Sequence, residues 1–155
     1  MTDYSLKDLK NALIRVGLKK GDNILCHSNI GYFGRVKGIK NSEQLCKAFL
    51  KVILSIIKKK GTFIVPTFSY SFFYKKNFEI KKTKSKMGIF SEYIRKHPKS
   101  TRSLDPNFSV SALGYHSQYF SEVNTENTYS EESFFDKFHK QNGKILDFNF
   151  IGSTI

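Results

Sequence analysis

Residues 21–65 read GDNILCHSNIGYFGRVKGIKNSEQLCKAFLKVILSIIKKKGTFIV, and this stretch decides the fold. The apolar run over 23–27 is typical of a buried strand, and a glycine-rich loop follows it. Asn41 or Ser42 is suited to cap a helix, whose expected end is marked by lysines and a glycine. The β-branched and aromatic run over 62–65 predicts a second strand. Strand, helix and strand in this order predict a βαβ unit with a right-handed crossover and parallel pairing.

The rest of the chain continues the alternation of helical and extended patterns. The further predicted elements are a helix over 5–16, a helix over 88–96, a strand over 109–113, a helix introduced by a capping box of Thr128 and Glu131, and a strand over 144–151. The fold class is therefore α/β, with a mostly parallel sheet flanked by helices in a three-layer α/β/α arrangement. No covering helix follows the last strand, so we expect this arrangement to be incomplete. Residues 1–155 are predicted to be the N-terminal part of a single domain, and 66–87 a functional loop within it.

Composition narrows the class of protein. The chain has 155 residues, of which 39% are apolar, and no apolar run approaches the roughly 20 residues of a membrane span. Its N-terminus carries charges and no apolar segment, so we expect no signal peptide and a cytoplasmic location. Cys26 and Cys46 lie in apolar surroundings without the spacing of a metal site, which predicts buried, inert thiols and no metal. The formal net charge of +13 leaves a basic nucleic-acid-binding domain as an alternative function.

Four short polar signatures follow one another along the chain, each beside a predicted strand or helix. They are Gly21-Asp22 with His27-Ser28-Asn29, Gly61-Thr62 with Pro66-Thr67-Phe68, Ser85-Lys86-Met87-Gly88, and Arg102-Ser103 with Asp105-Pro106 and Ser109. In this order they resemble the aminoglycoside 3-N-acetyltransferase family, whose members show GD…HSS, GT…PTF, S-x-MG and RS…HP…S. The set as a whole carries the resemblance, which covers residues 21–114.

The resemblance implies an α/β fold and transfer of an acetyl group from acetyl-CoA to an amino group of an amino sugar or aminoglycoside, a reaction of antibiotic resistance. Acetyl-CoA is then the cosubstrate, and no metal takes part. The implied cofactor-binding residues are His27, Ser28, Asn29, Ile30, Thr67, Ser69, Arg102, Ser103 and Ser109. Backbone amides after the first strand are expected to hold the pyrophosphate. Thr67 and Ser69 are placed along the pantetheine arm, and Arg102 beside a phosphate as a planar fork.

Each of these assignments has a structural alternative. His27 can orient the loop after its strand without touching a ligand, and Arg102 can be a surface ion-pair partner. The serines and the threonine that follow the first two strands can be turn formers. The aromatic run over 72–74 is interpreted as packing, not as a stacking platform. Asp105 stands where the family pattern has histidine, which places an anion near the expected cofactor region and can change pKa values there.

The catalytic residues of the family are expected to lie outside this chain. N-acetylation needs a base, and family members supply it with a histidine and an acidic partner beyond the segment that residues 145–155 resemble. The chain is therefore predicted to be truncated and inactive alone, unless a second polypeptide supplies the missing part. A non-catalytic CoA-binding remnant is the corresponding alternative. Because the chain is strongly basic, an anionic amino sugar, such as a nucleotide-linked one, fits it better than a polycationic aminoglycoside.

Overall fold

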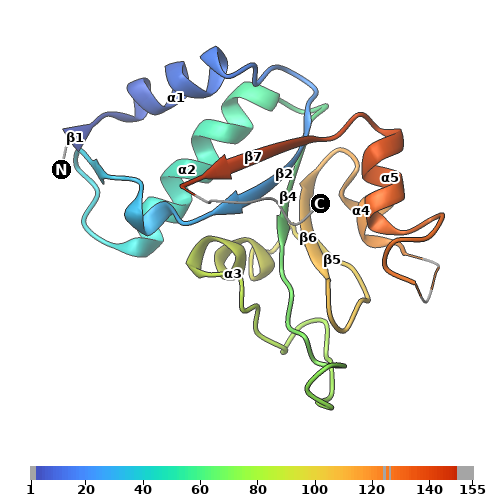
Figure 1. The fold of residues 1–155 in the computed structure, drawn as a ribbon. Coiled ribbons are helices and arrows are strands. Elements are labelled where there is room, and N and C mark those ends of the chain that lie inside the picture. Colours follow the sequence, from blue (N-terminus) through green and yellow to red (C-terminus); the bar gives the residue numbers. More distant parts are fainter. Residues whose placement is uncertain (1–2, 124, 126, 150–155) are drawn as a thin grey trace.

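The computed structural model describes residues 3–123, 125 and 127–149, and Figure 1 shows its fold. A five-stranded sheet in the order β5-β6-β4-β2-β7 forms the centre. Its strands are β2 (Asn23–Ser28), β4 (Thr62–Pro66), β5 (Thr101–Arg102), β6 (Val110–Gly114) and β7 (Lys144–Phe148). Two short strands, β1 (Asp3–Tyr4) and β3 (Arg35–Val36), pair with each other in parallel.

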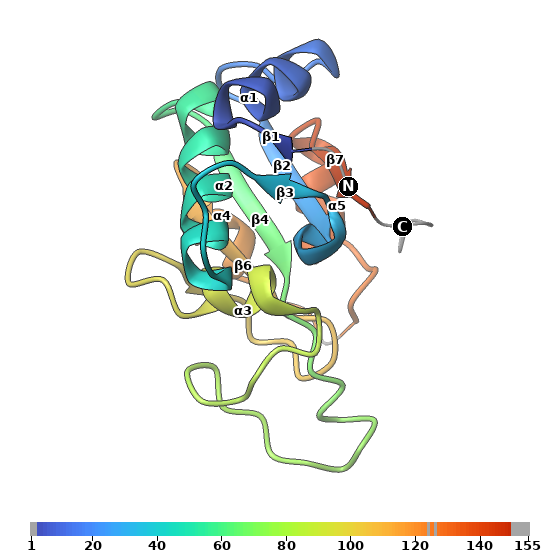
Figure 2. The same cartoon turned by 90° about the vertical axis from the view of Figure 1, so that its left-hand side faces the viewer.

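Helices cover both faces of the five-stranded sheet. They are α1 (Leu6–Arg15), α2 (Ser42–Ile57), α3 (Ile89–Arg95), α4 (Ser117–Ser121), α5 (Phe134–Lys140) and the 3-10 turn η1 (Ile30–Tyr32). One hydrophobic cluster joins α1, α2 and α3 to one face through residues such as Phe49 and Phe63, and a second joins α4 and α5 to the other through Ile64 and Phe120. Figures 1 and 2 show the resulting layers, which confirm the predicted three-layer α/β/α arrangement. No described helix is long and apolar enough to cross a bilayer.

The predicted βαβ unit is confirmed. Strands β2 and β4 pair in parallel, with Asn23 opposite Thr62, and α2 connects them. The Asn41 side chain caps α2 by accepting a hydrogen bond from the amide of Gln44 at 2.9 Å. Both cysteines are buried, and burial raises the pKa of both thiols, that of Cys46 to about 11, which agrees with the prediction of inert thiols.

The sheet is mixed, because β6 runs antiparallel to both of its neighbours, β4 and β5. At the end of β6, Gly114 lies opposite Thr62 and has a φ of 124°. A Cβ atom on Gly114 would lie 2.3 Å from the carbonyl oxygen of Gly61, so only glycine fits this approach of two backbones.

The structure corrects one predicted cap. Helix α5 is capped by Ser133, whose Oγ accepts a hydrogen bond from the Asp136 amide at 3.2 Å, and not by Thr128 with Glu131. Thr128 instead donates to Asp105 at 3.0 Å. The last strand was predicted over 144–151; it begins at residue 144 and its described part ends at Phe148, whereas residues 150 and 151 lie outside the described part.

Candidate cofactor site

The topology brings the nine predicted cofactor residues to one edge of the sheet. Strands β2, β4 and β5 run in the same direction, and the antiparallel β6 begins where they end. The residues at this edge therefore come from four strands that are distant in sequence. In open α/β sheets, ligands bind at this carboxyl edge. The nine residues divide there into two groups with different surroundings.

The first group, His27 to Ile30, lies at the end of β2. The Oγ atom of Ser28 is buried and has no hydrogen-bond partner among the described residues. The Asn29 amide donates to the carbonyl of Phe148 at 2.8 Å and is thus not open to a ligand. The amides of Ile30 and Gly31 begin the 3-10 turn, and neither donates to another described residue. Within the described part of the chain, the amides without an acceptor at this turn are therefore those of Ile30 and Gly31. The sequence analysis did not include Gly31 in the site, although the glycine-rich loop was a signal for it.

His27, next to this turn, is buried, and the residue is only 3% exposed. Burial lowers the pKa of His27, and Asp147, its register partner on β7, opposes that shift. The imidazole is therefore held largely neutral at neutral pH. A buried neutral imidazole suits the prediction that His27 orients the loop; direct contact with a ligand stays a prediction.

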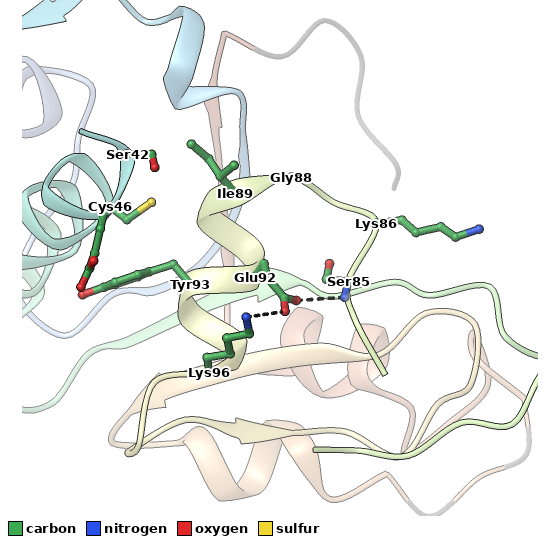
Figure 3. A pocket seen from close by; sticks show the side chains of 10 residues that line it. Ser42, Cys46, Ser85, Lys86, Gly88, Ile89, Glu92, Tyr93 and Lys96 are labelled. Carbon is green, nitrogen blue, oxygen red and sulfur yellow. Dashed lines mark hydrogen bonds and ion pairs between the residues drawn. The ribbon is translucent and has the colours of Figure 1, made fainter. Parts of the chain in front are cut away.

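Gly88 lies beside the end of β2. It has a φ of 91°, and a Cβ atom there would lie 4.0 Å from the carbonyl oxygen of Ser28. Next to it, a cavity of about 560 Å³ opens between α2 and α3 (Figure 3). The cavity is lined by Ser42, Glu43, Cys46, Ser85, Lys86, Gly88, Ile89, Glu92, Tyr93 and Lys96. Gly88 belongs to the third signature, which sequence reasoning noted without assigning it to the site.

The second group is centred on Arg102, which is buried. Its Nε donates to Ser109 Oγ at 3.1 Å, and its Nη2 to the carbonyl of Thr67 at 2.8 Å. Its Nη1 donates to the carbonyls of Ile80 at 2.9 Å and Thr83 at 2.6 Å. Four of the five N–H donors of the guanidinium are thus engaged within the protein. The alternative that Arg102 is a surface ion-pair partner is wrong, because the residue fixes the 66–87 loop from inside.

Burial lowers the pKa of Arg102 to about 10, the nearby charge of Arg95 acts in the same direction, and Glu92 opposes both. The guanidinium nevertheless stays charged at neutral pH. Its hydrogen bonds to backbone carbonyls are therefore charge-assisted.

The other members of the second group are buried with their polar atoms paired inside the protein. Thr67 Oγ1 donates to the Ser109 carbonyl at 3.0 Å, and Ser109 Oγ to the Thr67 carbonyl at 2.9 Å. Ser69 Oγ donates to the Pro106 carbonyl at 2.9 Å, while Ser103 Oγ accepts from the Val110 amide at 2.9 Å. These contacts join the ends of β4, β5 and β6. They favour a positioning role, and ligand contact by these residues stays a prediction.

Asp105, the departure from the family pattern, has a structural role in this chain. Its Oδ1 accepts from the amides of Asn107 and Phe108, each at 2.7 Å, and its Oδ2 accepts from Thr128. The carboxylate therefore caps the turn between β5 and β6.

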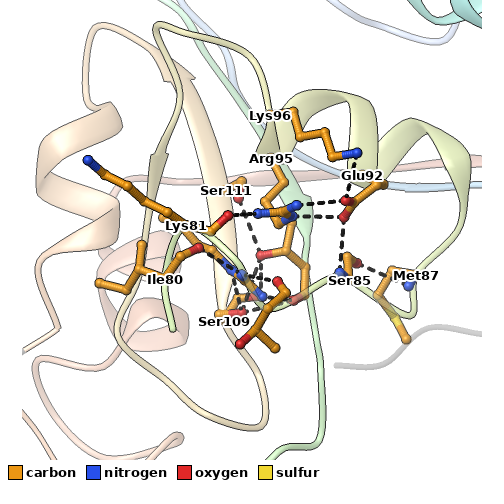
Figure 4. A network of polar contacts seen from close by, with 12 residues as sticks. Ile80, Lys81, Ser85, Met87, Glu92, Arg95, Lys96, Ser109 and Ser111 are labelled. Atoms are coloured by element: carbon orange, nitrogen blue, oxygen red, sulfur yellow. Dashed lines mark hydrogen bonds and ion pairs between the residues drawn. The ribbon is translucent and has the colours of Figure 1, made fainter. Parts of the chain in front are cut away.

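A second arginine anchors the same loop. Arg95 donates to the Lys81 carbonyl at 2.6 Å and to both carboxylate oxygens of Glu92, which itself accepts from the Ser85 amide at 3.0 Å (Figure 4). Partial burial opposes ionisation of Glu92, but the hydrogen bonds from Arg95 and Ser85 and the arginine charge outweigh it and lower the pKa of Glu92 to about 2. The carboxylate is ionised in the folded protein at any physiological pH.

Acidification is expected to reveal this anchor. The folded pKa of Glu92 lies below its ordinary value of 4.5, so its stabilisation is complete above pH 4.5 and is lost as the pH falls toward 2. We expect acidification to lower the free energy of unfolding by about 2 kcal/mol through this group at most, because solvent screens a partly exposed carboxylate. Urea unfolding at pH 6 and at pH 3 measures this loss of stability. Glu92→Gln should remove this part of the pH dependence. The control Glu79→Gln, which changes a carboxylate in an exposed ion pair, should leave it unchanged. An equal pH dependence in the wild type and Glu92→Gln would contradict it.

Comparison with known proteins supports these signatures as a set. The family model described as aminoglycoside 3-N-acetyltransferase matches residues 25–152, whereas no curated protein matches the chain. Among solved structures, AAC-IIIb with CoASH has a TM-score of 0.78 at 20% identity, covering 94% of this chain and 59% of that one. The apoenzyme of AAC(3)-IVa has a TM-score of 0.81 at 17% identity, covering 97% of this chain and 56% of that one. YokD from Bacillus subtilis has a TM-score of 0.72 at 22% identity, covering 86% and 60%.

These likenesses bear on the fold and on the length of the chain. The chain spans less than two thirds of the length of each of these three structures. The family model covers most of the chain and includes the last four residues of β2, the 66–87 loop and the strand β7. The chain therefore belongs to the aminoglycoside 3-N-acetyltransferase family.

Proposed function

We propose that this chain is the cofactor-binding part of a cytoplasmic, acetyl-CoA-dependent N-acetyltransferase that acts on an amino group of an amino sugar or aminoglycoside. Membership of the family and the likeness to the structure of AAC-IIIb with CoASH support this proposal. The observation that carries it is the turn after β2. There, the buried Ser28 hydroxyl and the amides of Ile30 and Gly31 have no hydrogen-bond partner among the described residues.

The groups at this turn fit a diphosphate. A buried hydroxyl without a partner is costly, and an anionic oxygen would satisfy it with a charge-assisted hydrogen bond. Two successive amides at the start of a turn form an anion-binding concavity. Gly88 lies beside the carbonyl of Ser28 and also lines the cavity between α2 and α3, which has Lys96 on its wall. We assign the diphosphate contact to Ser28, Ile30 and Gly31.

The described residues serve binding and positioning in this proposal. When bound, acetyl-CoA supplies the acetyl thioester. The 66–87 loop is held in place by Arg102, Thr67 and Ser109, and we place the amino acceptor beside this loop. The neutral His27 supports the turn after β2. The base that takes the proton from the amine is proposed to lie in the part of the family's length that this chain does not span. We expect activity only when that part is supplied, in one polypeptide or as a second one.

Calorimetric titration with CoA tests the proposal. Ser28→Ala is expected to weaken binding roughly tenfold, because a hydrogen bond to a charged oxygen is lost. Ser117→Ala is the matched control, since Ser117 is a half-buried serine in α4, on the opposite face of the sheet. A folded chain that does not bind CoA would overturn the proposal. Binding without acetyl transfer by a completed chain would instead support the non-catalytic remnant.

A further inference from the structure

The connection after β4 carries aromatic side chains on its surface. Phe72 and Phe73 are 73% and 74% exposed, and Tyr74 is 50% exposed. The interpretation of this run as packing is therefore wrong. Figure 2 shows the connection projecting from the edge of the sheet at which β4 ends. Large apolar side chains held in water on a loop are typical of binding surfaces.

The exposed phenylalanines sit on a firmly held turn, residues 70–76, which we call the aromatic turn. The Ser71 amide donates to the Pro106 carbonyl at 2.7 Å, and the Phe73 amide to Asn107 Oδ1 at 3.1 Å. Tyr70 and Lys75 have φ values of 54° and 52°, in the left-handed region that such side chains rarely adopt. Strained residues persist where the surrounding contacts enforce them, and they cluster at ligand sites.

Behind the aromatic turn lies a cavity of about 510 Å³ with aromatic walls. It is lined by Tyr70, Phe73, Tyr74, Asn107 and Phe108. The rings of Tyr70 and Phe108 meet edge to face, with centroids 5.8 Å apart. The Asn107 oxygen is taken by the turn, and its amide nitrogen donates to no described residue. Aromatic faces beside an amide donor suit a flat heterocycle such as a nucleobase, which stacks and accepts hydrogen bonds at its edge.

The connection that carries the aromatic turn is strongly basic, which favours an anionic ligand. Residues 70–87 contain six lysines and one acidic residue, Glu79. All six are exposed: Lys75, Lys76, Lys81, Lys82, Lys84 and Lys86. The Lys86 ammonium lies 3.7 Å from the centroid of the Tyr74 ring, at the wall of the cavity, and Lys82 pairs with Glu79. A polycation would be repelled here, whereas phosphates beside a stacked base would be attracted.

We propose that the aromatic turn binds a nucleoside diphosphate, and that the amino sugar accepted by this protein carries that group. The base lies against Phe73 and Tyr74, and Lys86 and its neighbours hold the phosphates. The turn follows β4, so it begins at the same sheet edge as the Ser28 turn. The second half of this inference rests on the proposed acetyltransferase function; the first half does not.

Calorimetry with UDP, CDP, ADP and GDP tests the inference directly. At least one of them is expected to bind, and uridine or the matching nucleoside to bind more weakly. The double variant Phe73→Ala, Tyr74→Ala should weaken binding by roughly tenfold or more, because the stacking of the base on these two rings is lost, and should leave CoA binding unchanged. Tyr115→Ala is the matched control, since Tyr115 is 67% exposed away from this loop. All replaced rings are exposed, so the variants should fold.

Competition distinguishes the possible sources of the ligand. Binding that persists in saturating CoA supports an acceptor site, whereas displacement by CoA would make the aromatic turn part of the cofactor site and overturn the inference. Far tighter binding of a single-stranded oligonucleotide would assign the surface to nucleic acid, also against the inference. A chain that binds CoA but none of the diphosphates refutes the inference alone. A chain that binds a diphosphate but not CoA keeps the turn's assignment and refutes the proposed function.

Discussion

Arg102→Met is expected to lower the free energy of unfolding by about 3–5 kcal/mol. The substitution keeps most of the side-chain volume but removes every donor of the guanidinium. The buried carbonyl of Thr67 and the hydroxyl of Ser109 lose a partner, and the carbonyls of Ile80 and Thr83 lose theirs where the loop crosses β5. Urea unfolding followed by circular dichroism measures the change, and proteolysis should cut first within 80–83.

Two variants separate positioning from ligand contact at this residue. Arg15→Met removes an exposed arginine from the end of α1 and should change stability by less than about 0.5 kcal/mol. Arg102→Lys keeps the charge but cannot form the fork and should fall between the two. If Arg102→Met were as stable as Arg15→Met but had lost CoA binding, the guanidinium would be a phosphate ligand and the positioning role would be refuted.

Gly114→Ala is expected to destabilise the fold by about 3 kcal/mol, and thus to lower the Tm by roughly 10 °C. The new methyl group would meet the Gly61 carbonyl oxygen at 2.3 Å and the Thr62 Cα at 2.9 Å. Thr62 is the first residue of β4 and Gly61 directly precedes it. These backbone atoms cannot move without shifting β4 against β6. Differential scanning calorimetry measures the loss.

Gly17→Ala provides the matched control for this collision. Gly17 has a φ of 93°, similar in sign to that of Gly114, but a Cβ atom there meets nothing within 4 Å. Its substitution should therefore cost only the conformational strain of about 1 kcal/mol. Equal losses at the two glycines would show that strain alone, and not the approach of the strands, decides the effect.

Local patterns predicted the elements well where one signal dominated. The Asn41 cap, the long apolar α2 and the stop before β4 are each marked within a few residues, so the βαβ unit followed from them. The predicted cap of α5 was wrong because the sequence offers two equivalent capping patterns. Thr128 and Ser133 each precede an acidic residue by three positions. The packing of Phe134 and Phe138 against α4 selects Ser133, and such long-range contacts leave no local mark. The antiparallel direction of β6 is likewise invisible in its own five residues.

The sequence predicted that the candidate residues would share one edge of the sheet, but it did not predict the surroundings of each side chain there. Strand order alone brings His27, Thr67 and Arg102 to one edge. Whether a side chain at that edge is buried depends on which other segment packs over it. Arg102 is held by the carbonyls of Ile80 and Thr83, about twenty positions earlier in the chain, and no local pattern marks this contact. Phe72 and Phe73 were misread for the converse reason, since an apolar residue is expected inside unless a fixed turn holds it out.

The interior position of Arg102 bears on the use of this residue as a sequence marker for antibiotic-resistance genes. A sequence survey that takes the pattern of Arg102, Ser103 and Ser109 as a sign of antibiotic resistance detects residues that hold a loop in place. In this chain these residues hold the loop in place through buried hydrogen bonds, whether or not an antibiotic is modified. We therefore expect the same three residues to be compatible with a protein of this fold that has changed its substrate or lost acetyl transfer.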